Sequence, residues 1–216
     1  MARHLLDVIT RTVIMTYEFF AKEFELQEIF LPNCTNAHIG PELYEEMGLG
    51  NDIRVAQATR PLFGKDRFVY VHHCDTPADK FIDLYSKIPG VRKLDGADTT
   101  DIERVKAAMP EAKFCAMVNP AALKELSLRQ LSERVAGDLR RGADELLIAN
   151  IDPVLDPDRV NALIRCVRQC CEEYGATPVF TVPPFTEDEY EWSFPMYQGR
   201  GTYHCRDDWR LLVPKP

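Results

Sequence analysis

The chain has 216 residues, of which 45% are apolar and 28% are charged, and its formal net charge is −8. This length and composition suit one sizeable globular domain with its own core. The acidic balance, together with the lack of a basic block, argues against nucleic acid and anionic membranes as partners.

The N-terminal segment has the features of neither a signal peptide nor a membrane span. Residues 5–15 are apolar in bulk, but Asp7 and Arg11 interrupt them and no small-residue cleavage site follows. No stretch reaches the roughly 18 uninterrupted apolar residues of a membrane helix. The cysteines number seven, an odd count, which favours reduced thiols or metal ligands over a disulfide framework. We therefore expect a cytoplasmic protein.

Helical spacing of apolar residues predicts an amphipathic helix over 3–22. Beyond it, short apolar runs that predict strands alternate with capping residues and prolines that predict helix starts. Strands are expected at 28–32, 67–72, 91–94, 113–118 and 145–151, with a last apolar run at 177–182. Helices are expected to begin at Gly40-Pro41, Thr76-Pro77, Thr100, Ser127 and Asp156-Pro157. The last of these helices is expected to end at Gly175.

This alternation predicts an α/β fold with a parallel sheet, because each crossover between strands carries a helix. The short, almost continuously apolar strands fit a sheet that is buried on both faces. Residues 1–182 would form this βα-repeat domain. Residues 183–216 hold both tryptophans and show no clean period, so they would be an irregular aromatic tail packed on the core. A lid or a partner-binding segment is the alternative for this tail.

Polar residues follow each predicted strand. Because parallel strands end at one edge of a sheet, these side chains would converge on one cleft. Polar loops are common and Asn or Asp before proline is ordinary turn chemistry, so the most specific signal is the His and Cys after the second strand. The polar residues expected to line the cleft are Asn33, Asn119, Asn150 and Asp152.

The sequence of residues 69–77 is Val-Tyr-Val-His-His-Cys-Asp-Thr-Pro. In an extended segment His72 and Cys74 point the same way, while His73 points to the other side. Imidazole with thiolate suits zinc, which at a catalytic site takes a third protein ligand and keeps one position open. The candidates for that third ligand are Cys34, Cys115 and, less favoured, Cys205.

Four segments together carry a family resemblance. They are 39–46 (IGPELYEE), 71–75 (VHHCD), the unit from Asp101-Ile102 to the Asn-Pro turn and Leu123, and 156–163 (DPDRVNAL). In order and spacing they resemble the C-terminal part of the uroporphyrinogen decarboxylase-like superfamily, which includes cobalamin- and coenzyme M-dependent methyltransferases. The segment 71–75 is similar to the His-x-Cys-Gly motif of the methyltransferase branch. The likeness covers about residues 5–175.

The resemblance implies a partial or truncated TIM barrel and zinc-dependent methyl transfer between a corrinoid and a thiol. It makes His72 and Cys74 the first two zinc ligands. The chain departs from the branch at Asp75, which replaces a glycine, and near Ala149, where the branch has its third ligand cysteine. A closed barrel typically takes about 250 residues, so five or six βα units would leave open edges. We expect these edges to be covered by the tail, by a second copy in a homodimer, or by a separate subunit equivalent to the family's N-terminal half.

Three functions therefore stay open. The first is a methyltransferase-like enzyme with zinc. The second is a non-catalytic half-barrel subunit or partner of a corrinoid protein, which the missing ligand cysteine favours. The third is a decarboxylase of the uroporphyrinogen type, for which Arg54, Arg60 and Arg67 could bind a polycarboxylate. The net acidity, and the absence of the family half that carries a carboxylate important to that branch, argue against the third.

Overall fold

The protein is described from a computed structural model, which covers residues 2–24, 26, 28–62, 68–73, 76–148 and 156–175. These residues form an α/β fold around a five-stranded parallel sheet in the order β1-β2-β3-β4-β5. The strands are β1 (Glu28–Pro32), β2 (Phe68–His73), β3 (Val91–Ala97), β4 (Lys113–Val118) and β5 (Glu145–Ile148). The predicted parallel sheet of alternating strands and helices is confirmed.

Helices join successive strands, and a long helix precedes β1. The helices are α1 (Ala2–Glu23), α2 (Asn36–Met47), α3 (Leu49–Thr59), α4 (Ile82–Tyr85), α5 (Ile102–Ala108), α6 (Pro120–Glu125), α7 (Leu128–Arg140) and α8 (Pro157–Glu173). Short 3-10 turns lie at η1 (Arg60–Leu62) and η2 (Asp79–Phe81). Within the described ranges, no helix has both the length and the apolar character needed to cross a membrane.

The chain divides into two compact units. The first comprises residues 1–117 and 141–147 and so holds nearly all of the sheet, and the second comprises 118–140 and 148–216. Within the second unit α7 packs against α8, where Oγ of Ser132 lies 3.1 Å from Sγ of Cys170. The predicted domain boundary at residue 182, the apolar run at 177–182 and the aromatic tail lie outside the described residues.

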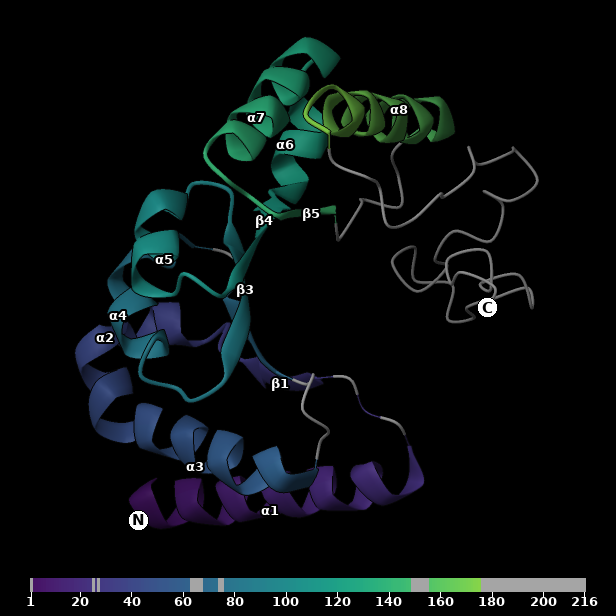
Figure 1. The fold of residues 1–216 in the computed structure, drawn as a ribbon. Helices are drawn as coiled ribbons and strands as arrows, with labels where there is room; N and C mark the ends of the chain where they lie inside the picture. The colour runs from purple at the N-terminus through teal and green to yellow at the C-terminus, as the bar shows by residue number, and fades with distance from the viewer. Residues whose placement is uncertain are drawn as a thin grey trace. The chain divides into compact units, whose positions relative to one another are not determined.

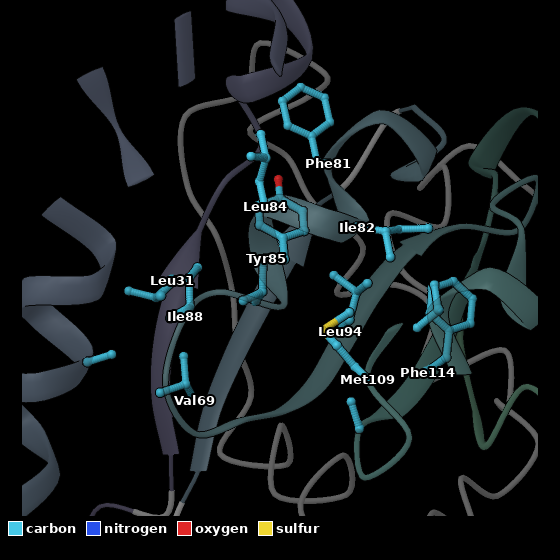
Figure 2. Packing of buried hydrophobic residues seen from close by; sticks show 14 of the residues in the cluster. Leu31, Val69, Phe81, Ile82, Leu84, Tyr85, Ile88, Leu94, Met109 and Phe114 are labelled. Atoms are coloured by element: carbon cyan, nitrogen blue, oxygen red, sulfur yellow. The ribbon is translucent and has the colours of Figure 1, made fainter. Parts of the chain in front are cut away.

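In the first unit, α2, α3, α4 and α5 lie on one side of the sheet (Figure 1). Alternation along the strands turns Val71, Leu94 and Phe114 towards these helices, and all three are fully buried. Figure 2 shows Leu94 and Phe114 among the same cluster of side chains as Ile82 and Tyr85. This hydrophobic core fixes which face of each strand is covered by helices. The intervening residues of β2, β3 and β4 must therefore point to the opposite face.

The sequence signals for α7 and α8 of the second unit are confirmed. Ser127 and Gln130 form a reciprocal capping box, in which N of Ser127 donates to Oε1 of Gln130 at 3.0 Å and N of Gln130 donates to Oγ of Ser127 at 3.3 Å. At the start of α8, Oδ1 of Asp156 accepts from N of Asp158 at 2.9 Å. Gly175 follows the helix with φ of 70°, a conformation that favours glycine.

The expected helix start at Thr76-Pro77 is wrong. The chain makes the 3-10 turn η2 there, and α4 begins only at Ile82. Oγ1 of Thr76 does not cap a helix and instead lies 3.2 Å from Nε2 of His73. The buried imidazole needs a polar partner, and this tertiary contact competes with the local capping that the sequence suggests.

Two further helix starts differ in position. Asp101 caps α5 by accepting from N of Arg104 at 3.1 Å, whereas the neighbouring Thr100 accepts from N of Ala78 at 3.1 Å. The helix expected from Gly40-Pro41 begins earlier, at Asn36, and Gly40 interrupts it with φ of 77°. The proline therefore opens only the second segment of α2.

Candidate functional site

Four residues form one row across neighbouring strands of the sheet. The register pairs Pro32 with His72, His72 with Asp95, and Asp95 with Cys115. The alternation places these residues on the sheet face opposite α2–α5. The side chain of His72 is 18% exposed, whereas that of Asp95 is 0% exposed. A partly accessible imidazole thus lies beside a fully buried carboxylate.

Asp95 is the centre of this group because both of its oxygens accept hydrogen bonds. Oδ1 accepts from the backbone N of His73 at 3.0 Å. Oδ2 lies 2.7 Å from Nδ1 of His72 and also accepts from the hydroxyl of Tyr70. A buried carboxylate is costly unless it is satisfied in this way. The carboxylate therefore has a fixed orientation, and it fixes that of the His72 ring.

The hydrogen bond to Asp95 determines the tautomer of neutral His72. An ionised carboxylate only accepts hydrogen bonds, so Nδ1 of His72 must carry the ring proton. The lone pair is then on Nε2, which has no hydrogen-bond partner among the described residues. A carboxylate behind Nδ1 is the arrangement that orients histidine ligands in metal sites and histidine bases in catalytic ones.

The surroundings of Tyr70 keep it a neutral donor. Burial, followed by the hydrogen bond to Asp95, holds the pKa of Tyr70 well above its ordinary value. Nζ of Lys93 lies 4.7 Å from the centre of the Tyr70 ring and 2.7 Å from Oε2 of Glu145.

Phe30 lies beside His72, with ring centroids 5.4 Å apart. The site thus combines an oriented imidazole with an aromatic side chain.

His73 points to the opposite face from His72, as predicted, and is fully buried. Its Nδ1 lies 2.7 Å from the hydroxyl of Tyr85, which itself accepts from Nδ2 of Asn36 at 3.1 Å. The hydroxyl proton of Tyr85 is therefore available to Nδ1, and Nε2–H of His73 is directed to Thr76. This network holds the end of β2 against α2 and α4, and we assign His73 a structural role.

Asn33 belongs to a second buried polar group, at the end of β1. Its Nδ2 donates to Oδ2 of Asp52 on α3 at 3.0 Å, and the hydroxyl of Tyr44 donates to the same oxygen at 2.7 Å. Burial raises the pKa of Asp52 despite both hydrogen bonds. The amide of Asn33, predicted to line the cleft, is thus engaged with Asp52.

In the described part of the chain, no group of at least three His, Cys, Asp or Glu residues lies close enough together to hold a metal ion. Cys74 lies outside the described residues. Cys34 is partly exposed in the turn after β1, and Cys115 is buried in β4. Burial raises the pKa of the Cys115 thiol to about 12, so this thiol stays protonated unless a cation binds it.

The remaining predicted site residues are distributed as follows. Oδ1 of Asn119 accepts from N of Ala121 at 2.8 Å and caps α6. Asn150 and Asp152 lie outside the described residues. Of the arginines considered for a polycarboxylate, Nη1 of Arg54 lies 2.9 Å from Oδ1 of Asp7, so it ties α3 to α1. Arg60 is exposed in η1, and Arg67 lies outside the described residues.

The sequence pattern pointed to His72, and it also included Asp95 among the polar residues that follow the predicted strands. Only the register shows that Asp95 lies opposite His72. Tyr70 and Lys93 gave no separate signal. Comparison with models of known protein families found no match, and comparison with curated proteins found none either.

Proposed function

We propose that this chain is a methyltransferase-like protein of the uroporphyrinogen decarboxylase type, built as a partial TIM barrel, that binds zinc through His72 and Cys74. The observation that carries the proposal is the hydrogen bond between Asp95 and His72. It leaves Nε2 of His72 as the group available to a ligand on the face opposite the helices. The sequential order of parallel strands supports a partial barrel, because consecutive βα units in one direction build such folds.

The donor chemistry of the residues fits zinc. Neutral imidazole and thiolate are ligands that zinc prefers, and a carboxylate behind the histidine strengthens such a ligand. In extended backbone Cys74 would follow His72 on the same face of the strand. Cys34 and Cys115 are the candidates for a third ligand. Cys115 lies in the same row as His72, with Asp95 between them, and Cys34 lies in the turn after β1.

Different residues of the chain would have different roles in the proposed reaction. A zinc ion bound here would lower the pKa of a thiol substrate so that it is held as thiolate at neutral pH. Asp95 and Tyr70 keep His72 in one orientation and one tautomer. The aromatic ring of Phe30 lies next to the imidazole of His72. In the proposed overall reaction, the methyl–cobalt bond of a corrinoid would break and a carbon–sulfur bond would form. The thiol would lose its proton, and the cobalt would keep the electron pair.

The decisive experiment measures bound zinc by elemental analysis of the full-length protein. We expect close to one zinc per chain in the wild type and loss of this zinc in His72→Ala and in Cys74→Ala. His38→Ala is the matched control, because His38 is an exposed histidine on α2. Comparison of Cys34→Ala with Cys115→Ala identifies the third ligand. Zinc-free wild-type protein with an unchanged fold would refute the proposal.

Methyl transfer is tested separately, with methylcobalamin as donor and a panel of small thiols as acceptors. The change in corrinoid absorbance and the appearance of thioether measure the two halves of the reaction. We expect turnover only in zinc-loaded protein, and none in His72→Ala. Because thiols at Cys34 and Cys74 must stay reduced to bind zinc, we propose the cytoplasm as the compartment.

A second candidate function is a non-catalytic subunit that is completed by another chain. The order of the sheet favours it, because β1 and β5 are at its two edges among the described strands. The completing chain would be a subunit that supplies the remaining βα units or a corrinoid protein. Zinc binding without turnover by the chain alone, and turnover after addition of such a subunit, would select this candidate.

A further inference from the structure

Helix α1 is apolar on two sides, of which one packs on the described part of the protein and the other is exposed. The inner side carries Val13, Ile14 and Tyr17, which contact the core cluster. The hydroxyl of Tyr17 also donates to the backbone O of Phe30 and accepts from its backbone N, both at 2.8 Å. Phe30 lies on the edge strand β1, so this pair of bonds covers part of the sheet edge. The rotation of α1 about its axis is thereby fixed.

The outer side of α1 is a continuous exposed apolar stripe, which we call the α1 stripe. Together with Thr12 and Thr16, the large residues of the stripe recur at helical spacing, so they lie along one side of the helix. Two threonines lie between them, and their hydroxyls donate to backbone carbonyls one turn earlier, at 3.0 Å and 2.9 Å, which leaves the methyl groups for packing. The exposed fractions are 59% for Leu5, 40% for Val8, 49% for Ile9, 66% for Met15 and 59% for Phe19.

The apolar spacing that predicts an amphipathic helix over 3–22 includes residues of both sides. Val13 and Ile14 pack on the core cluster, whereas Leu5 and Ile9 are exposed. Single exposed apolar residues are normal on a protein surface. A contiguous exposed apolar stripe over several turns marks an interaction surface, and association with another protein is one such use.

We propose that the α1 stripe pairs with the same stripe of a second copy of this chain, with the two helices antiparallel. The argument rests on the charges beside the stripe. Arg11 and Glu18 lie on the same border of the stripe, one heptad apart. In a two-fold antiparallel pair, Arg11 of each chain faces Glu18 of the partner, so the contact is made twice. In that register Val8 packs against Phe19 of the partner, and Thr12 against Met15 of the partner.

The ion pairs of α1 leave the side chains of Arg11 and Glu18 available for contacts with a second chain. Arg11 is 58% exposed at its side chain and lies 2.9 Å from Asp7 on its own helix. Asp7 in turn also binds Arg54, so Asp7 keeps a basic partner if Arg11 turns to the second chain. No residue of the described part forms an ion pair with Glu18. Pairing would give Glu18 a basic partner without breaking a contact that the fold requires.

The size of the contact predicts a reversible dimer. One helix pair buries less than the roughly 800 Å² per partner of a standard stable interface. We therefore expect a monomer–dimer equilibrium that depends on protein concentration, with a dissociation constant on the order of micromolar. This inference is independent of zinc and of methyl transfer, since the α1 stripe includes no residue of the row that contains His72.

The test is a charge-swap series followed by sedimentation velocity over a range of concentrations. Arg11→Glu places two carboxylates opposite each other at both contacts with Glu18, and Glu18→Arg places two guanidinium groups together at both. Each variant alone should dimerise about tenfold more weakly than the wild type. An equimolar mixture of the two variants should recover dimerisation, because both pairs in the mixed dimer are again of opposite charge. The double variant, with both changes in one chain, should recover it as well.

A second pair of variants tests the apolar contact. Met15→Glu puts a carboxylate in the centre of the α1 stripe and should abolish the dimer. Leu43→Glu is the control, because Leu43 is a similarly exposed residue on α2. Monomeric wild type at every concentration would overturn the proposal. A dimer that Met15→Glu leaves unchanged, or single charge variants whose mixture does not recover, would overturn it equally.

Discussion

Nδ1 of His72 lies 2.7 Å from Oδ2 of Asp95, and the two residues are direct register partners on β2 and β3. This relationship links the fold to the chemistry of the site. The parallel register sets the pair side by side, and burial makes Asp95 dependent on its hydrogen-bond donors. The imidazole is thus oriented by a residue that cannot easily move. A flexible surface histidine would have to lose that freedom on binding a ligand.

Asp95→Asn should disturb His72 in a way that NMR can detect. An amide has one acceptor oxygen, which the backbone N of His73 requires, so its NH2 group would face Nδ1 of His72. The imidazole would then carry its proton on Nε2. We expect a reversed tautomer in the ¹⁵N spectrum and zinc affinity lower by about 10- to 100-fold.

Tyr70→Phe is the control for this experiment. It removes one donor to Asp95 but leaves the carboxylate to accept from His72. We expect the tautomer of His72 to be unchanged and the effect on zinc affinity to be small. An Asp95→Asn protein that retained the wild-type tautomer would contradict the assigned role of the carboxylate.

His73→Phe should affect stability and leave the proposed zinc ligands in place. The buried ring packs between Phe81 and Tyr85, with centroids at 5.0 Å and 5.7 Å. A phenyl ring preserves much of that packing but removes the partner of the Tyr85 hydroxyl, at a cost of about 1–3 kcal/mol. Urea denaturation measures the loss. A double-mutant cycle with Tyr85→Phe should show coupling, because the two side chains share one hydrogen bond.

Gly96 lies where β3 approaches the turn before α4 closely. A Cβ atom added to Gly96 would lie 3.1 Å from Oγ1 of Thr100 and 3.6 Å from Cβ of Ala78. Gly96→Ala should therefore displace Thr100 and destabilise the protein by about 1–3 kcal/mol. Gly137→Ala on α7 should do the opposite, because nothing lies within 4 Å of its added Cβ and alanine favours helix by about 1 kcal/mol. Equal effects in thermal denaturation would contradict this account.

Sequence alone could predict strand positions where burial is the dominant constraint. β1 and β4 begin and end at the expected residues, because each is a short, mostly apolar run. β3 was expected only over 91–94, yet it extends to Ala97. The predicted strand stopped before Asp95, and the hydrogen bonds that let a carboxylate continue the strand come from β2. These partners are distant in sequence, so no local pattern reveals them.

Helix starts were predictable where the capping bonds are local. Ser127 with Gln130 meets this condition. The Asn-Pro pair at 119–120 predicted a turn, and the structure instead uses it to begin α6. At the site, the alternation of side chains between the two faces of a strand was enough to place His72 and His73 on opposite faces. This alternation depends only on the extended backbone of β2. The register that brings Asp95 to His72 depends on how two strands pack on common helices, which the sequence of neither strand contains.

Asp52→Asn should stabilise the protein at neutral pH. Burial raises the pKa of Asp52 above its ordinary value of 3.8, so the folded state binds a proton that the unfolded chain releases. The resulting stability is complete below the ordinary value and is lost as pH rises through the raised value. An amide oxygen can still accept from Tyr44 and Asn33. In urea denaturation from about pH 3 to about pH 8, we expect the variant to exceed the wild type at high pH and to match it at low pH.

The control for this pH series is Asp7→Asn, which should show the opposite sign. The hydrogen bond from Arg54, followed by the other nearby cations, lowers the pKa of Asp7. Its stabilisation is therefore present above the ordinary pKa and is lost as pH falls through the lowered value. The Asp7 variant should be less stable than the wild type at neutral pH, with the difference shrinking in acid. If Asp52→Asn also lowered the free energy of unfolding at neutral pH, the carboxylate of Asp52 would be stabilising, and burial would not be the dominant influence on it.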